Sequence, residues 1–212
     1  MNKYLIFIVA AGWLCISVAP PKMTPLQKLL EGNARYVQNT LEHPNRSLER
    51  REEVTSGQEP FAIIIACADS RVGPEIIFDQ GIGDLFVVRV AGNVIGPLEL
   101  ESIQYAALNL HSSVILVLGH ERCGAVDAVL KNTTSNIEEI AALIEPAVAK
   151  VKASKPANLL AAATKANAIN MKNALLTNSL LQPLLTNKAL TIYAGYYNLQ
   201  TGAVEILDTS SP

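Results

Sequence analysis

Short apolar runs recur along the middle of the chain, and each of them stops abruptly at glycine or polar residues. Three such segments are Phe61 to Ala66, Asp84 to Val90 and Val114 to Leu118. A run of this length that ends in turn chemistry is typical of a buried β-strand. Between them, Pro74 to Phe78 and Pro97 to His111 have the composition of helices that open at a proline. Strands that alternate with helices predict βαβ units and a mainly parallel sheet.

The last third of the chain predicts helices followed by a hairpin. The alanine-rich segment Thr133 to Ala174 predicts two or more helices, divided around Lys155-Pro156. Pro183 is expected to interrupt another apolar helical stretch. Leu190 to Tyr197 and Ala203 to Leu207 are strand-like runs around a short turn, and they predict a hairpin at the edge of the sheet.

A helical arm is expected before the first strand. Thr24-Pro25 is a typical helix start, and apolar side chains follow it at helical spacing from Leu26 to Leu30. Gly32-Asn33 is expected to interrupt this helix. The apolar stripe has no evident local partner, which favours an arm that packs on another subunit. The predicted fold is therefore α/β, with a mainly parallel β-sheet of about five strands flanked by helices and an N-terminal helical arm.

The first residues have the pattern of a signal peptide for export. Lys3 supplies a positive start, Tyr4 to Ala19 carries no charged residue, and Ser17-Val18-Ala19 offers the small residues of a cleavage site. Pro20 counts against efficient cleavage, so an uncleaved anchor is the alternative, although the run is short for a spanning helix of about 20 residues. If the segment directs export, the protein is expected to be periplasmic or secreted. The alternatives are a membrane-anchored or a cytoplasmic protein. Any contact with a membrane is expected only through this segment.

Composition narrows the class of protein further. The chain has 212 residues, which suits one domain at 23–212 after a signal peptide or membrane anchor at 1–22. The formal net charge is -2, so no nucleic-acid partner is indicated. Three cysteines are too few for a disulfide scaffold.

Two of the predicted strands end at residues that bind metals. Cys67 follows the first strand directly, and His120 and Cys123 follow the third. In open α/β sheets, sites lie at the outer ends of the strands. Two thiolates and one imidazole suit zinc, and three protein ligands leave a catalytic zinc one open position. Two small buried cysteines or a Cys67–Cys123 disulfide are the alternatives that the spacing alone leaves open.

Asp69 and Arg71 strengthen the catalytic interpretation. They lie two residues apart immediately after Cys67. A guanidinium that holds a carboxylate by two hydrogen bonds fixes its rotamer and keeps it ionised, so that it can accept a hydrogen bond from a zinc-bound hydroxide. If the pair opened, Asp69 could instead take the fourth zinc position. A surface ion pair of little energetic value is the remaining alternative.

Taken together, these motifs resemble a known enzyme family. Cys67-Ala68-Asp69-Ser70-Arg71 followed by His120-x-x-Cys123-Gly124 is similar to the signature of the β-class carbonic anhydrases. The segments Leu29 to Arg35, Gly81 to Arg89 and Tyr193 to Tyr197 also resemble that family. The resemblance covers nearly all of 23–212.

The resemblance implies a ligand set and a pocket. Zinc, one ion per subunit, would be bound by Cys67, His120 and Cys123, with Asp69 and Arg71 as the catalytic dyad. The substrate pocket would lie at a dimer interface, which implies a homodimer or a higher homo-oligomer. The residues that match the family's substrate-binding positions are Gln58, Phe86, Tyr105 and Gly124. Ala91 stands where the plant-like branch has valine beside the pocket.

The implied reaction is the zinc-dependent, reversible hydration of carbon dioxide to bicarbonate and a proton. Because two thiolates cancel the charge of the ion, its bound water is expected to be less acidic than at a three-histidine site, and activity should rise above neutral pH. The reaction also releases a proton, and the sequence leaves four candidates for its carrier, namely His43, His111, a carboxylate or buffer. Hydrolysis of carbonyl sulfide or carbon disulfide on the same zinc is one alternative, and a non-catalytic zinc- or bicarbonate-binding protein is another.

Overall fold

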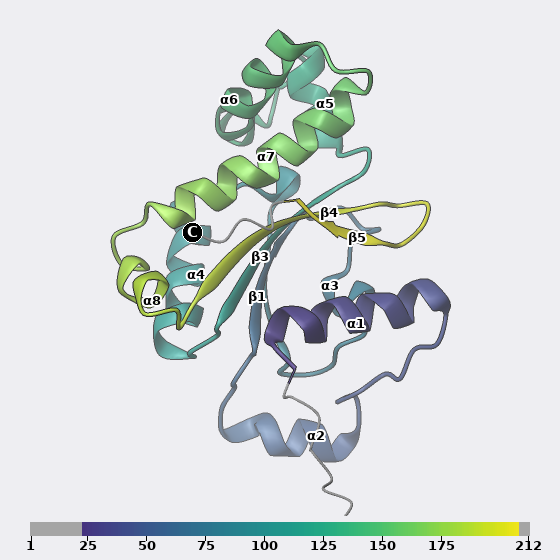
Figure 1. The fold of residues 1–212 in the computed structure, drawn as a ribbon, viewed down its shortest axis with the longest axis vertical. Coiled ribbons are helices and arrows are strands. Elements are labelled where there is room, and N and C mark those ends of the chain that lie inside the picture. Colours follow the sequence, from purple (N-terminus) through teal and green to yellow (C-terminus); the bar gives the residue numbers. More distant parts are fainter. Residues whose placement is uncertain (1–22, 208–212) are drawn as a thin grey trace, which may run out of the picture.

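One twisted sheet organises the molecule. The computed structural model describes residues 23–207 (Figure 1). Within them the strands are β1 (Ala62–Ala66), β2 (Leu85–Arg89), β3 (Val114–His120), β4 (Thr191–Tyr197) and β5 (Val204–Ile206). Their order is β2-β1-β3-β4-β5. The first four run parallel and β5 is antiparallel to β4, so the predicted parallel sheet with a hairpin at its edge is confirmed.

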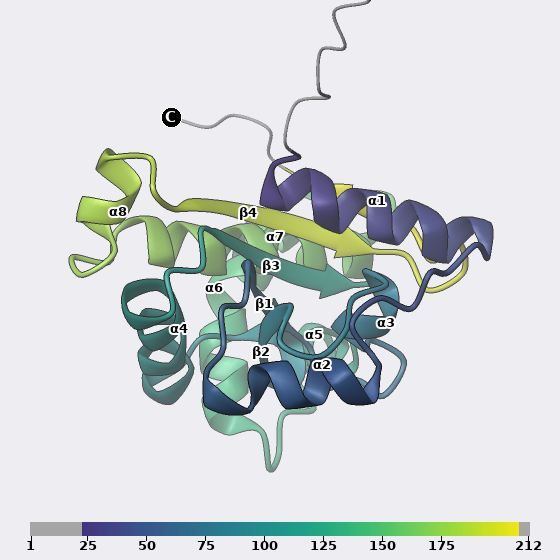
Figure 2. The ribbon, with the colours of Figure 1, turned by 90° about the horizontal axis from the view of Figure 1, so that it is seen from below.

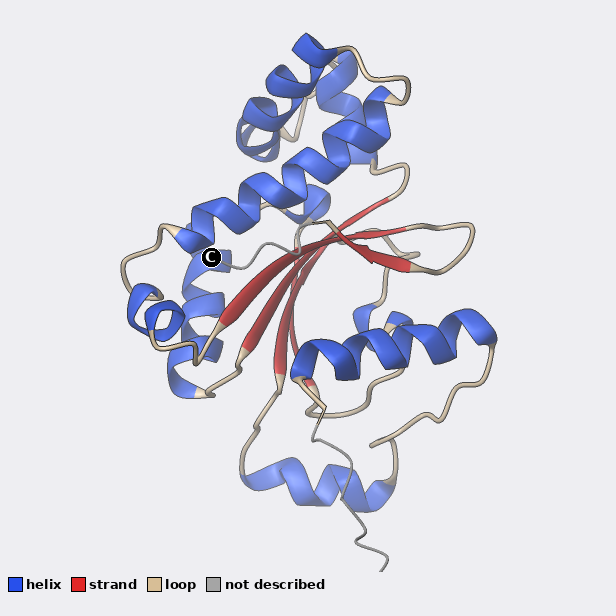
Figure 3. Ribbon diagram, viewed as in Figure 1, coloured by secondary structure: helices blue, strands red, loops and turns tan. Residues whose placement is uncertain are grey.

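Helices cover both faces of the sheet (Figures 2 and 3). Successive residues of β1 point to opposite faces, as the pleat requires. Ile63 and Ile65 face a core built with α4 (Pro97–Asn109), α5 (Gly124–Lys131), α6 (Glu138–Ser154) and α7 (Leu159–Leu176). Ile64 and Ala66 face a second core with Leu29 of α1 (Pro25–Gln38) and residues of α3 (Pro74–Ile77). Because β1 and β3 are buried on both faces, their sequences are continuously apolar.

The N-terminal arm differs from the expectation in two ways. The helix α1 continues through Gly32 and Asn33 rather than breaking there. A Cβ at Gly32 would lie 1.8 Å from the carbonyl oxygen of Phe78, so glycine lets the helix approach α3 closely. The Asn33 amide donates to the carbonyls of Ile77 and Gly202 and accepts from Val204. The arm therefore packs on its own chain, and the prediction that nothing local covers it was wrong.

Several other boundaries correct the sequence interpretation. Pro183 does not interrupt a helix but lies in the first turn of α8 (Gln182–Thr186), where its missing N–H is not needed. Between α1 and β1, where no element is predicted above, the chain forms α2 (Leu48–Glu53) and a short 3₁₀ turn, η1 (Val54–Ser56). The division of the alanine-rich segment around Lys155-Pro156 is confirmed, because α6 ends at Ser154 and α7 begins at Leu159.

The N-terminal leader lies outside the described residues. Signal peptide, anchor and the division at residue 22 therefore stay predictions. Among residues 23–207, every helix is too short or too polar to cross a bilayer.

Candidate metal centre

The register of the sheet brings the three metal-binding side chains together. Ala66, the last residue of β1, pairs with Leu118, and β3 continues two residues further to His120. Cys67 follows Ala66, and Cys123 is the N-cap of α5. The Sγ atoms of the two cysteines and a ring nitrogen of His120 all lie within 4.8 Å of one another, and all three residues are buried.

His120 is oriented by its own backbone neighbourhood. Its Nδ1 lies 2.9 Å from the carbonyl oxygen of Glu121, which is the partner expected for a protonated Nδ1. The amide N–H of Glu121 in turn donates to the carbonyl of Tyr197 at the end of β4. Nε2 is thereby left with its lone pair, and it finds no hydrogen-bond partner among residues 23–207. An imidazole nitrogen that is buried, unpartnered and beside two thiols fits a metal ligand.

Cys67 is held as a thiolate. Hydrogen bonding from the Cys123 thiol, the nearby His120 ring and the backbone N–H groups of Asp69 and Gly92 outweighs burial and lowers the pKa of Cys67 to about 4. The Gly92 nitrogen is 3.3 Å from Sγ. A thiolate is the form that binds metals, so this ligand is already prepared at neutral pH.

The pKa of Cys123 shifts in the opposite direction, because its thiol donates a hydrogen bond to the sulfur of Cys67. The hydrogen bond to Cys67, together with burial, raises the pKa of Cys123. The first amides of α5, those of Ala125 and Val126, act in the other direction. A second negative charge in this buried place needs a cation to balance it, which also fits a metal site.

The dyad predicted from the sequence is closed. The Arg71 guanidinium donates from Nε and from its terminal nitrogen to the two carboxylate oxygens of Asp69, at 2.9 and 2.7 Å. This bidentate bond holds the pKa of Asp69 well below its usual range. The Asp69 side chain is only 17% exposed, and its Oδ2 lies 3.9 Å from His120 Nε2. The carboxylate thus stands beside the metal-binding atoms without being drawn in as a fourth ligand.

Arg89 is a site residue that the sequence interpretation missed. It ends β2, opposite Ala66. Its guanidinium donates to the carbonyls of Cys67 and Asp69, at 3.0 and 2.6 Å, and so fixes the loop that carries both side chains. The signal that could have revealed it is a charged residue at the carboxyl end of an edge strand beside the ligand loop.

Comparisons with known proteins agree with this geometry. The family model described as carbonic anhydrase matches residues 62–204, which include every member of the cluster and the dyad. The solved β-carbonic anhydrase CcaA superposes with a TM-score of 0.69 at 26% identity, over 86% of this chain and 95% of that one. The chain belongs to the β-class carbonic anhydrase family.

Other carbonic anhydrases are also similar to this chain. Carbonic anhydrase 2 of Mycobacterium tuberculosis is 54% identical over 102 residues, which are 48% of this chain and 49% of that protein. The chain thus matches about half the length of such curated relatives. A tetrameric β-carbonic anhydrase of Sordaria macrospora shares the fold, with a TM-score of 0.65 at 19% identity, over 76% of this chain and 87% of that one.

The substrate-binding positions of a β-class carbonic anhydrase are only partly gathered within one chain. Phe86 pairs with Ile63, four residues before Cys67 and therefore about 13 Å away along β1. Tyr105 lies beside Phe86, with ring centroids 6.4 Å apart. Gln58 is exposed and precedes β1, at the end of the strand opposite Cys67. Gly124 alone adjoins the cluster, and a Cβ there would meet no atom within 4 Å, so space is open beside Cys123.

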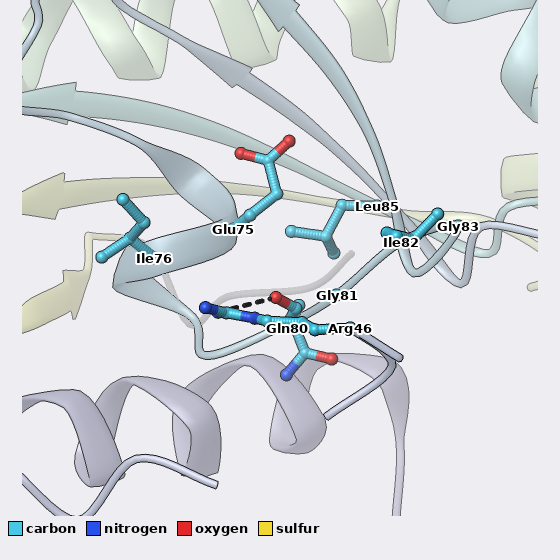
Figure 4. A pocket seen from close by; sticks show the side chains of 8 residues that line it. All are labelled: Arg46, Glu75, Ile76, Gln80, Gly81, Ile82, Gly83 and Leu85. Carbon is cyan, nitrogen blue, oxygen red and sulfur yellow. Dashed lines mark hydrogen bonds between the residues drawn. The ribbon is translucent and has the colours of Figure 1, made fainter. Parts of the chain in front are cut away.

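A separate pocket lies along the same edge of the sheet (Figure 4). It has a volume of about 310 Å³ and includes none of the cluster residues. Its lining comes from the loop before β2, from α3 and from Arg46, which donates to the carbonyl of Gln80 at 3.1 Å. Ile76 and Ile82 stand at this pocket with exposed side chains. The pocket has a mixed polar and apolar lining at the start of β2, and it is separate from the metal centre.

Proposed function

We propose that this protein catalyses the reversible hydration of carbon dioxide to bicarbonate and a proton, with one zinc ion per subunit. The observation that carries the proposal is the buried cluster of two sulfurs and one unpartnered imidazole nitrogen, with a fixed carboxylate 3.9 Å from that nitrogen. Zinc bound by three protein ligands supplies a water that is acidic enough to attack carbon dioxide near neutral pH.

Each residue then has a defined task. Cys67, His120 and Cys123 hold the ion. Asp69 accepts a hydrogen bond from the attacking water and aims its lone pair, and it can do so because Arg71 keeps the carboxylate ionised and in one rotamer. Because the cluster is buried while the Arg71 side chain is 53% exposed, we place the substrate entrance on the side of the dyad.

The direct test is a metal analysis combined with a stopped-flow assay of carbon dioxide hydration. Wild-type protein should contain about one zinc per chain and lose activity to a chelator until zinc is restored. His120→Asn should lose both zinc and activity. His111→Asn is the matched control, because His111 is exposed and its φ of 56° suits asparagine. Protein that holds one zinc per chain and does not hydrate carbon dioxide would refute the proposal, and the same sample would then be assayed with carbonyl sulfide and carbon disulfide.

We further propose that the active form is a homodimer or a larger homo-oligomer. β2 is an edge strand whose residues Leu85 to Val88 are only half-buried, unlike those of β1. On the neighbouring helix α4, the side chains of Leu98 and Tyr105 are 74% and 49% exposed, and they lie on one face of the helix because they are seven residues apart. A second copy that covers this surface would bring its own Gln58, Phe86 and Tyr105 toward the first subunit's metal centre.

Light scattering after size exclusion tests this assembly. Leu98→Glu should shift the protein toward monomer and lower carbon dioxide hydration, whereas Leu180→Glu, at a residue 54% exposed near α8, should do neither. A monomeric and fully active wild-type protein would rule the assembly out.

A further inference from the structure

Gly92 is fixed at both of its backbone polar groups. Its N–H donates to the sulfur of Cys67 at 3.3 Å, and its carbonyl oxygen accepts from the side-chain amide of Asn167 at 2.8 Å. Asn167 lies in the middle of α7, 75 residues further along the chain, and it is completely buried. One side chain on a long helix is thus connected to a metal-binding sulfur through a single residue.

The turn that carries Gly92 is buried and packs near Ala125 and Ile144, but it makes few backbone hydrogen bonds of its own. Within residues 23–207, one other backbone hydrogen bond is made by the 3₁₀ turn η2 (Ala91–Asn93), from the N–H of Asn93 to the carbonyl of Val90 at 2.9 Å. Gly92 itself has φ 72° and ψ 12°, a left-handed conformation that glycine can also leave at low energetic cost. The Asn167 hydrogen bond holds the carbonyl on one side of the Gly92 Cα, and the N–H···S bond to Cys67 lies on the other side, so the two bonds together restrict φ and ψ of Gly92.

The helix α7, which carries Asn167, also packs against β3, the strand that ends in His120. A Cβ at Gly119 would lie 3.2 Å from both the methyl group and the carbonyl oxygen of Thr164, and 3.5 Å from the Cβ of Ala168. The Thr164 hydroxyl is used inside the helix, where it donates to the carbonyl of Leu160. Thr164 and Ala168 therefore contribute packing alone, whereas Asn167 makes a directed hydrogen bond toward the ligand loop.

The side-chain oxygen of Asn167 carries a cost in stability, because it is buried without a hydrogen-bond partner within residues 23–207. A buried acceptor left unpaired destabilises a protein by about 1–3 kcal/mol. An apolar residue of similar volume would remove this unpaired acceptor but would leave the buried carbonyl of Gly92 without its partner, so the contribution of Asn167 lies in its bond to Gly92.

We infer that Asn167 is a positioning residue of the metal centre, which orients the Gly92 N–H toward Cys67 and thereby fixes the direction and donor strength of that thiolate. The inference rests on the proposed zinc site, but it concerns ligand geometry rather than the reaction. Groups that orient a ligand from outside the coordination sphere typically contribute tenfold to hundredfold to metal affinity.

The experiment compares Asn167→Leu with Asn173→Leu in the full chain. Both are asparagine-to-leucine changes on α7, but Asn173 is exposed, so it controls for the substitution itself. Zinc affinity is measured by competition with a chromophoric chelator. Asn167→Leu should bind zinc about tenfold to hundredfold more weakly, and Asn173→Leu should match the wild type.

Cobalt substitution supplies a readout that a purely structural role would not change. When the N–H···S bond is lost, the Cys67 thiolate becomes a stronger donor, and its charge-transfer band to Co²⁺ should move to longer wavelength in Asn167→Leu only. Asn167→Ala, which cannot overfill the site, repeats both measurements. Zinc affinity and a cobalt spectrum equal to those of the wild type would overturn the inference, and so would failure of both variants to fold without metal.

The two proposals fail in different ways. Wild-type protein that binds zinc without hydrating carbon dioxide refutes the proposed reaction and leaves the role of Asn167 intact. Wild-type protein that hydrates carbon dioxide, with an Asn167→Leu variant of unchanged zinc affinity, refutes only the role of Asn167.

Discussion

Asp69 Oδ2 lies 3.9 Å from His120 Nε2, although Asp69 follows β1 and His120 is the last residue of β3. The Arg71 guanidinium and the Arg71 backbone N–H both donate to the Asp69 carboxylate. The acid is therefore held next to the metal-binding nitrogen in a fixed orientation, and the pair that holds it is formed by residues only two apart in sequence.

Loosening this pair should lower turnover and leave metal binding intact. In Asp69→Asn the acceptor becomes an amide that cannot keep a full negative charge toward the attacking water. We expect kcat for carbon dioxide hydration to fall about a hundredfold, the range seen when one positioned acid–base group is removed. Zinc content should remain near one per chain by elemental analysis.

Arg71 provides the control for this experiment. Arg71→Lys retains the positive charge but offers a point charge in place of a two-pronged donor, so its loss of activity should be smaller than that of Asp69→Asn. If Asp69→Asn lost zinc instead of turnover, the carboxylate would be a metal ligand and not an orienting group.

The buried carboxylate of Asp79 should make the free energy of unfolding depend on pH. Burial alone would raise the pKa of Asp79, but the amide N–H groups of Glu42 and His43 and the Arg35 guanidinium, 2.7 Å away, hold it below its ordinary value. The side chain is fully buried. A pKa that is lowered in the folded state stabilises the protein above the unfolded value, near pH 4, and the contribution is lost as pH falls through the folded value.

Urea unfolding at two pH values measures this contribution. Asp79→Asn should lower the free energy of unfolding by about 3 kcal/mol at pH 7, because Arg35 loses its buried partner. The difference between wild type and variant should shrink below about pH 4, as the wild-type carboxyl begins to take up a proton. A difference that stays constant from pH 7 to pH 3 would contradict the assignment of the effect to this carboxylate.

Gly92 should tolerate no side chain. A Cβ at this position would lie 2.7 Å from Cδ1 of Ile144, and its φ of 72° is unfavourable for other residues. We expect Gly92→Ala to lower the free energy of unfolding by about 1–3 kcal/mol. Gly57→Ala is the matched control, since Gly57 is extended, with φ 174°, and a Cβ there meets nothing within 4 Å. Thermal unfolding of the two metal-free variants would decide the matter, and equal melting temperatures would count against the strain at Gly92.

The hydrogen bonds of Asn33 should help to attach the helix α1 to the rest of the chain. Its amide joins α1 to the carbonyl of Ile77 in α3 and to Gly202 and Val204 in the β4–β5 hairpin. Asn33→Ala removes all three bonds and leaves their buried partners unpaired, so the loss should reach about 2–4 kcal/mol. Hydrogen exchange should show faster exchange in α1 and in the hairpin together. Protection unchanged in both segments would mean that the packing of Leu29 and the Arg35–Asp79 ion pair are enough to attach the helix.

The sequence was most informative where structure and chemistry are local. Buried strands such as β1 and β3 are apolar without interruption, and the residues that follow them supply both the cluster and the dyad. Cys67, Asp69 and Arg71 lie within five positions, so their proximity follows from chain geometry. His120 joins them because parallel strands in register end at the same edge of the sheet.

Contacts between distant segments were beyond such reasoning. Gly32 has the local signature of a helix break, yet the helix continues because α3 approaches it at that point. Pro183 is ambiguous in sequence between a helix interruption and a helix start, and only the end of α7 at Leu176 decides between them. The Asn167 bond to Gly92 joins a side chain to a backbone carbonyl across 75 residues, and no periodicity encodes it.

The register of β1 and β3 also bears on the order of events in biogenesis. Cys67 reaches the other two ligands only after Ala66 and Leu118 are paired, whereas an unfolded chain offers just His120 and Cys123 as near neighbours. If the proposed ion binds, we expect it to bind a chain in which β1 and β3 are already paired, and its binding would then stabilise the folded form relative to the unfolded chain.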